Sequence, residues 1–108
     1  MARTDKLQGA LDLLILRTLR RGPLHGYGIV CRIQQTSEGV LEVEEGSLYP
    51  ALHRIEREGW VKSEWKLTEH NRRAKVYHLT AQGRKQLERE VEAWNRLSLA
   101  VGHVLRNA

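Results

Sequence analysis

The sequence predicts a mainly α-helical fold with a small β-hairpin, namely a winged helix-turn-helix followed by a long C-terminal helix. Three observations lead to this prediction. Apolar residues three and four positions apart recur in the first 60 residues, the period falls to two between residues 60 and 79, and a heptad-like pattern fills the remainder. This order of elements is typical of the fold, although winged helices that bind only proteins share it.

Two helices are expected before residue 40. The first ends at Gly22-Pro23, because proline cannot continue a helix. Its apolar face consists of Leu7, Leu11, Leu14, Ile15 and Leu19. After the break, His25-Gly26-Tyr27 leads into a second helix that ends within residues 36–39.

A third helix should start at Ser47 and end at Gly59. Leu48, Leu52 and Ile55 follow helical spacing, Ser47 is a suitable N-cap, and Pro50 fits the first turn. Glycine is the commonest residue just past a helix end, which agrees with Gly59 as the stop.

Residues 60–67 and 75–79 alternate as strands do, and the polar, basic stretch 68–74 between them predicts a hairpin tip. Thr80 then caps a helix over residues 81–106, which would be about 39 Å long at 1.5 Å per residue. So long a helix cannot fold back fully on a small domain, so its seam predicts a homodimer. The predicted interface residues are Leu87, Val91, Trp94, Val101 and Leu105.

Composition limits the classes of function. The 108 residues suffice for one modest core, and 18 Lys plus Arg against 13 Asp plus Glu give a net charge of +5. An anionic partner is therefore expected. The single Cys31 allows no intrachain disulfide, and no apolar run approaches a membrane span, so we expect a cytoplasmic protein that does not insert in membranes.

Enzymatic and metal chemistry find no support in the pattern. The five histidines lack the paired spacing of metal ligands, no glycine-rich phosphate loop follows a strand, and Ser47 lacks the context of a catalytic nucleophile. We expect no catalytic residue, metal or cofactor.

DNA is the anion that the fold favours, because the third helix of a helix-turn-helix enters the major groove. Its side away from the apolar face carries groups that can contact bases or phosphates. These are Ser47, Tyr49, Pro50, His53, Arg54 and Arg57. The alternative is a merely solvated helix face. Glu42, Glu44 and Glu45, just before this helix, would repel phosphates, although they also favour its positive N-terminal end.

Two further groups could contact the DNA backbone. Arg72, Arg73 and Lys75 lie at or beside the hairpin tip, where cations can straddle phosphates or enter a minor groove. His25 and Tyr27 open the second helix, whose free N–H groups favour an anion. For Tyr27, packing between helices is an equal alternative.

The tryptophans allow different interpretations. We expect Trp60 and Trp65 in the core. Trp94 fits the core of a dimer, but paired Trp94 rings could also form flat walls around a planar aromatic ligand.

Taken in order, several motifs resemble the PadR family of bacterial transcriptional regulators. They are Gly9-Ala-Leu-Asp-Leu-Leu-Ile-Leu16, Gly22-Pro-Leu-His-Gly-Tyr-Gly28, Glu45-Gly-Ser-Leu-Tyr-Pro-Ala-Leu52, Glu58-Gly-Trp60 and Lys75-Val-Tyr-His-Leu-Thr-Ala-Gln-Gly83. Nearly the whole chain is covered, and the combination is highly specific. The wing tip departs from the family, since His70-Asn71-Arg72-Arg73-Ala74 lacks the usual glycine.

The resemblance implies a repressor that binds an inverted-repeat operator as a homodimer through a single C-terminal helix. Residues 1–80 would form the DNA-binding domain and residues 81–108 the dimerisation helix. Some relatives bind flat aromatic drugs at the dimer interface. The corresponding candidates here are Leu13, Arg17, Val91, Trp94 and Ser98. Arg17 and Glu90, beside the expected pore, could instead pair and close it.

Two other classes stay open from the residues alone. One is a winged helix that binds an acidic protein, and the other is a small-molecule sensor that does not depend on DNA.

Overall fold

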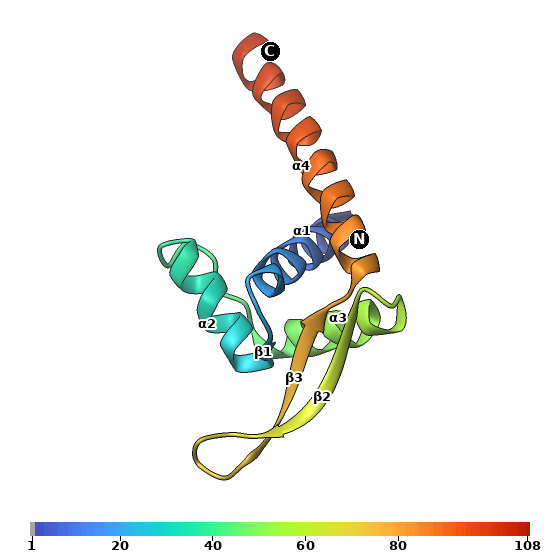
Figure 1. Ribbon diagram of the computed structural model, residues 1–108. Helices are drawn as coiled ribbons and strands as arrows, with labels where there is room; N and C mark the ends of the chain where they lie inside the picture. The colour runs from blue at the N-terminus through green and yellow to red at the C-terminus, as the bar shows by residue number, and fades with distance from the viewer. Residues whose placement is uncertain (1) are drawn as a thin grey trace.

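The computed structural model describes residues 2–108, with side chains described for residues 10–108. Along this part of the chain the elements are α1 (Ala2–Arg20), β1 (Leu24–His25), α2 (Gly26–Thr36), α3 (Glu45–Arg57), β2 (Val61–Leu67), β3 (Arg73–Leu79) and α4 (Ala81–Asn107). Figure 1 shows α1, α2 and α3 grouped together, with the β2–β3 hairpin projecting on one side and α4 on the other. The predicted winged helix-turn-helix with a long C-terminal helix is confirmed.

The sheet has three antiparallel strands in the order β1-β3-β2, whereas the sequence predicted a two-stranded hairpin. The additional strand β1 pairs Leu24 with Tyr77 and His25 with Val76. A strand of two residues has no periodicity of its own, and it forms here because the chain passes the free edge of β3 before α2 begins. The strand therefore fixes the start of α2 against the base of the hairpin.

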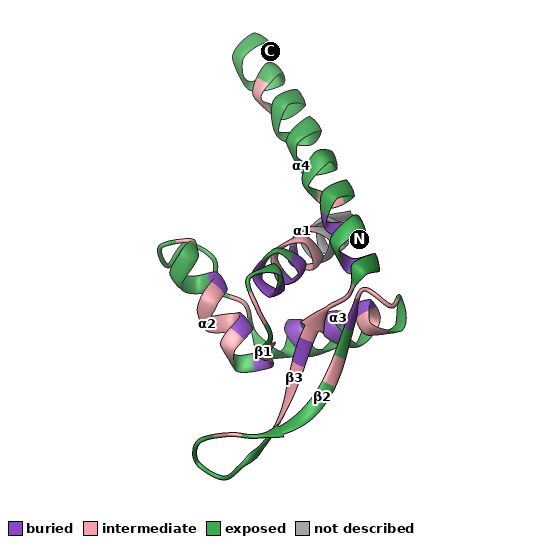
Figure 2. Ribbon diagram, in the orientation of Figure 1, coloured by how far each residue is buried: buried purple, intermediate pink, exposed green. Residues whose placement is uncertain are grey.

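The core lies where the three short helices face one another and the base of the sheet (Figure 2). Leu48 and Ile55 of α3 are fully buried, as the helical spacing predicts. Leu7, which belongs to the predicted face of the first helix, lies outside the described side chains. The buried apolar residues are Leu11, Ile15, Leu16, Leu19, Ile29, Ile33, Leu48, Ala51, Leu52, Ile55, Val61, Tyr77 and Leu87.

Helix α3 begins earlier than predicted. The N–H groups of Ser47 and Leu48 both donate to the carbonyl of Glu44, at 3.0 Å each, so helical hydrogen bonding starts at Glu44. Glu44 is therefore the N-cap, without a side-chain cap hydrogen bond. The prediction that Ser47 caps the helix is wrong, and Pro50 lies in the second turn rather than the first.

The end of α3 agrees with the prediction. Gly59 has a φ of 81°, and the N–H groups of Gly59 and Trp60 donate to the carbonyls of Glu56 and Ile55. This is the Schellman arrangement, which a residue with a Cβ adopts only with strain.

Thr80 joins the end of α3 to the start of α4. Its hydroxyl donates to the Gly59 carbonyl at 2.6 Å and accepts the Gly83 N–H at 3.0 Å, so it caps α4 as predicted. Its own N–H donates to the Trp60 carbonyl. A Cβ built on Gly83 would collide with that same carbonyl oxygen. These four residues, Gly59, Trp60, Thr80 and Gly83, are called the Thr80 junction below.

Helix α4 is buried only near its start. Leu87 lies in the core, so its assignment to a dimer interface is wrong: it packs within the same chain and is not available to a partner. The residues from Val91 onward are exposed, apart from the half-buried Gly102. None of the helices described within residues 2–108 is long and apolar enough to cross a membrane.

Replacing Gly83 by Ala should destabilise the protein by about 2 to 4 kcal/mol, because the new methyl group meets the rigid Trp60 backbone rather than a movable side chain. Thermal and urea unfolding measure this change. Gly46→Ala is the matched control, since nothing lies within 4 Å of a Cβ there and α3 continues through it. An equal, small effect of the two substitutions would contradict the close contact at the junction.

Candidate nucleic-acid interface

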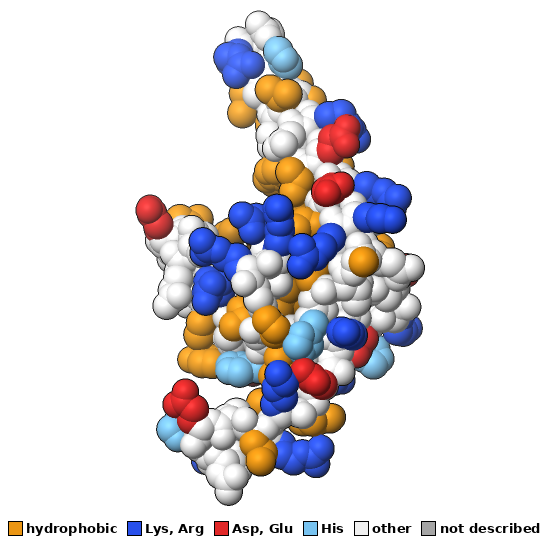
Figure 3. Space-filling view, viewed as in Figure 1, with side chains coloured by type: hydrophobic (Ala, Val, Ile, Leu, Met, Phe, Trp, Pro, Cys, Tyr) orange, Lys and Arg blue, Asp and Glu red, His pale blue; other side chains and the backbone are white. Residues whose placement is uncertain are grey.

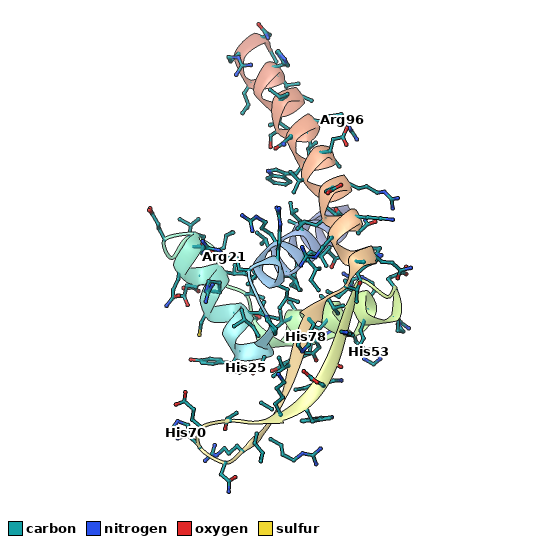
Figure 4. All side chains as sticks on the ribbon, viewed as in Figure 1. Arg21, His25, His53, His70, His78 and Arg96 are labelled. Carbon is teal, nitrogen blue, oxygen red and sulfur yellow. The ribbon has the colours of Figure 1, made fainter. Side chains whose placement is uncertain are left out.

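An open groove of about 1350 Å³ lies between the start of α2, the exposed side of α3 and the hairpin. It is lined by residues from all three elements. Seven of the ten predicted DNA-binding residues are among them, namely His25, Tyr27, Tyr49, His53, Arg72, Arg73 and Lys75. Figure 4 shows His25 at the base of α2 and His70 on the hairpin tip opposite. The structure thus brings together groups that are up to 50 positions apart in the chain.

His25 caps α2. Its Nδ1 accepts the Gly28 N–H at 3.0 Å, and its backbone is extended, as at a helix N-cap. With Nδ1 used as an acceptor, the ring proton of a neutral imidazole is on Nε2. His25 therefore offers a donor beside the free N–H groups of the helix start, which is a combination suited to an anion.

Tyr49 lies across the start of α2. A Cβ built on Gly26 would be 2.8 Å from the Tyr49 hydroxyl and 2.9 Å from its ring, so glycine is what allows the ring to lie there. Nothing in the periodicity indicated Gly26 as a residue of the site. Tyr27 is exposed, which favours the backbone-contacting interpretation over packing between helices, and Cys31, four residues further on, raises the pKa of its hydroxyl.

Helix α3 exposes Ser47, Tyr49, Pro50 and His53, as predicted. Arg54 is different: it is half-buried, and its guanidinium forms an ion pair and hydrogen bond with Asp12 of α1, on a flank of α3 between its buried and exposed sides. Its assignment to the exposed, DNA-facing side is therefore wrong. Burial raises the pKa of Asp12, and the Arg54 charge acts in the opposite direction.

Two residues that the sequence analysis missed attach the hairpin to α3. Glu56 accepts the Ser63 hydroxyl at 2.5 Å, and its other carboxylate oxygen lies 3.8 Å from Lys75 Nζ. Lys75 lines the groove, but the nearby Glu56 carboxylate partly neutralises its positive charge. No spacing in the sequence signals the contact, because it depends on how the hairpin lies against the helix.

The hairpin tip closes without glycine. The Thr68 N–H donates to the Arg72 carbonyl at 2.7 Å, and Asn71 takes the left-handed conformation, with φ of 60°. Asparagine tolerates this conformation better than most residues, so it replaces the glycine of the usual tip. Arg72 and Arg73 consequently lie exposed at the tip as predicted.

The prediction that Trp65 belongs to the core is wrong. Its side chain is 59% exposed, because β2 extends past α3 and its outer residues have no helix to cover them. Arg73 covers the ring instead, with its Cζ 5.2 Å from the ring centroid. Trp60, at the base of the hairpin, is half-buried against the core as expected.

The other face of the hairpin has its own ion pairs. Glu64 Oε1 lies 2.8 Å from His78 Nε2 and 3.3 Å from Lys66 Nζ. The hydrogen bond to His78, followed by that to Lys66, lowers the pKa of Glu64. The contact of Glu64 with His78 ties β2 to β3, whereas its contact with Lys66, which also lines the groove, stays within β2.

The residues predicted for the dimer seam and for a ligand lie on α1 and α4, far from the groove. Val91, Trp94, Ser98, Val101 and Leu105 are exposed, and Figure 3 shows hydrophobic side chains along α4 beyond its base. Leu13 is half-buried and Arg17 exposed. Glu90 accepts a hydrogen bond from Gln86 in its own helix at 2.9 Å. Among residues 10–108, no cluster of three His, Cys, Asp or Glu side chains could hold a metal.

Comparison with known proteins gives one consistent match. The Transcriptional regulator PadR-like family matches residues 15–89. A transcriptional regulator of Mycobacterium tuberculosis is 32% identical over 94 residues, which cover 87% of this chain and 84% of that protein. An uncharacterized 37.1 kDa protein in a Streptomyces fradiae transposon is 41% identical over 97 residues, or 90% of this chain, but the match spans only 26% of that longer protein.

Solved structures agree. A transcriptional regulator from Clostridium thermocellum has a TM-score of 0.82 and 28% identity, and the match covers 91% of this chain and 95% of that one. The Bacillus subtilis PadR, whose structure contains operator DNA, has a TM-score of 0.68 and 26% identity over 76% of this chain and 45% of that chain.

A double-mutant cycle tests the new position of Arg54. Asp12→Ala and Arg54→Ala should each destabilise the protein, and their coupling energy in urea unfolding should be about 1 to 2 kcal/mol, because each leaves the other charge half-buried without its partner. Arg57→Ala, on the exposed side of the same helix, is the control and should show no coupling with Asp12→Ala. Additive effects of the first pair would mean that Arg54 is free for another partner.

Proposed function

The chain belongs to the PadR-like family of transcriptional regulators, and on this basis we propose that it is a sequence-specific DNA-binding regulator. The observation that carries the proposal is the groove, in which the start of α2, the exposed side of α3 and the basic hairpin face one surface. The similarity to a fold solved with operator DNA supports it.

In this proposal α3 enters the major groove and presents Ser47, Tyr49, Pro50 and His53 to the base edges. Tyr27 and the Nε2 donor of His25 contact the phosphate backbone at the start of α2. Arg72 and Arg73 contact the neighbouring backbone or groove from the hairpin tip.

We further propose a homodimer formed through α4. The exposed Val91, Trp94, Val101 and Leu105 lie on one side of a helix that projects from the domain (Figure 1). So large an apolar face on a projecting helix favours burial against another subunit. A two-fold dimer would bind an inverted-repeat operator, with its two α3 helices about one turn of DNA apart. A dimer bound at a promoter would block transcription, which makes repression the expected mode.

Release by an aromatic effector stays a prediction. It would place the ligand between subunits, against Leu13, Arg17, Val91, Trp94 and Ser98. A ligand that fits only one separation of the two α4 helices would change the spacing of the α3 helices and so the affinity for the operator.

The DNA-binding proposal predicts that the protein selects fragments with inverted repeats from the source genome and that its affinity falls steeply with salt. Tyr49→Ala should weaken operator binding at least about tenfold with little change in melting temperature, because Tyr49 is exposed. Fluorescence anisotropy with labelled operator, in excess competitor DNA, measures both effects.

Arg96→Ala is the control, since it removes an exposed cation on α4, far from the groove, where Arg96 pairs with Glu92 of its own helix. It should leave operator affinity unchanged. A binding isotherm without preference for any inverted repeat would refute the proposal and favour a protein partner.

The dimer proposal predicts sedimentation as a dimer at micromolar concentration. Val101→Asp places a charge in the seam and should shift the equilibrium toward monomer. Leu99→Asp is the matched control, because Leu99 is also exposed, at 63% against 47% for Val101, but lies on the other side of α4. A monomeric wild-type protein, or equal effects of the two substitutions, would contradict this seam.

A further inference from the structure

The hairpin has an outer segment that the rest of the protein does not cover. In the β2–β3 register, Ser63 pairs with Tyr77, Trp65 with Lys75, and Leu67 with Arg73, so these side chains share one face of the ribbon. The inner part of this face is held by the core and by Glu56. Beyond it, Trp65 is 59% and Leu67 68% exposed. Two large, exposed apolar side chains thus line the groove on the part of the hairpin that projects from the helices.

Lys75 and Arg73, the two β3 cations on this face, each lie over an aromatic ring, since Lys75 Nζ is 5.8 Å from the centroid of Tyr77, but they differ in their ion pairs. Lys75 pairs with Glu56, and Lys66 pairs with Glu64. Arg73 forms no ion pair with any side chain described in residues 10–108, and its guanidinium lies over the Trp65 ring. Stacking on an aromatic face leaves the charge intact and leaves the N–H groups at the edge of the guanidinium free.

The position of this pair relative to α3 is fixed. Glu56, on α3, holds Ser63 and Lys75. These are the same-face neighbours of Trp65 and Arg73, each two residues nearer the base of the hairpin along its own strand. Arg73 therefore lies at a set distance from the side chains with which α3 would meet base edges. In the proposed complex, Arg73 would therefore contact the DNA at a constant number of base pairs from the bases that α3 contacts.

We propose that the Trp65–Arg73 pair makes the hairpin selective for a narrow, A·T-rich minor groove beside each half-site, with Trp65 as the positioning residue for Arg73. The inference rests on the proposed DNA-binding function. A·T-rich segments have a narrow minor groove with enhanced negative potential, into which arginine is preferentially drawn. The 2-amino group of guanine both widens and blocks that groove. Leu67, paired with Arg73 across the strands, would lie against the sugar walls.

The test uses the full chain and one recovered operator whose half-sites are kept while the flanking segments are changed. Flanks of A·T, G·C and inosine·C pairs distinguish recognition through the minor groove from recognition through the major groove. An inosine·C pair has the major-groove pattern of G·C but lacks the 2-amino group in the minor groove. We expect A·T and inosine·C flanks to bind about five- to tenfold more tightly than G·C flanks. Moving the A·T segment by about half a helical turn should remove the advantage.

Variants assign the effect to the pair. Trp65→Ala and Arg73→Lys should both reduce the flank preference to less than about twofold, whereas Trp65→Phe, which keeps an aromatic face, should retain it. Neither Trp65→Ala nor Arg73→Lys changes the number of cations, so the slope of affinity against salt should stay constant. Lys62→Ala, which removes a cation from the opposite face of β2, is the control and should leave the preference unchanged.

Three outcomes would overturn the proposal. The first is no flank preference in the wild type, and the second is an undiminished flank preference in both Trp65→Ala and Arg73→Lys. The third is a loss of affinity in these variants that is equal on all flanks. The last would mean that the pair contacts phosphates or only stiffens the hairpin. These outcomes all leave operator binding itself in place. Failure to bind any inverted repeat would instead refute the proposed function, and the present inference with it.

Discussion

One hydroxyl group, that of Thr80, holds the functional parts of this protein in a fixed arrangement. It donates to the carbonyl that ends α3 and accepts an N–H from the first turn of α4, while β3 runs directly into the same residue. Helix α3, the hairpin and the projecting helix α4 therefore meet at one point. In the proposed dimer, the separation of the two α3 helices depends on the direction in which α4 leaves the Thr80 junction. The absence of a side chain at Gly83 is what lets α4 approach closely enough for this contact.

The charged side chains of α3 mostly serve to position the helix. Arg54 binds α1 through Asp12, and Glu56 binds the hairpin through Ser63 and Lys75. Both contacts lie on the flanks of the helix, between its buried and exposed sides. The exposed side keeps only polar or weakly basic groups at most positions, so in the proposed complex α3 would discriminate among bases with few charges. Most of the electrostatic attraction to DNA would then come from the hairpin.

Local patterns could predict the long elements of this fold, since an amphipathic helix or an alternating strand carries its period within its own residues. Contacts between distant residues could not be predicted in the same way. Strand β1 exists only because β3 offers it an edge. Arg54 lies at the border between the buried and exposed faces of α3, where the position of an ion-pair partner decides which way the side chain points. That partner is Asp12, 42 positions away. Leu87 fits the heptad pattern of α4, but it is buried because the core extends to the first turns of that helix. Trp65 fits the alternation of a core strand, but it is exposed because β2 extends past the end of α3.

The acidic residues at the start of α3, Glu44 and Glu45, place negative charge near one side of the groove. Glu44 caps the helix without a side-chain hydrogen bond, and both Glu44 and Glu45 are exposed. Glu45 is close enough to Tyr27 to contribute to its raised pKa. Carboxylates near the positive end of a helix stabilise it, yet at this edge of the groove they also repel phosphates. The opposite edge carries Arg72 and Arg73. A duplex approaching the groove would therefore be drawn to the hairpin edge and kept from the loop before α3, which sets its orientation before any base is contacted.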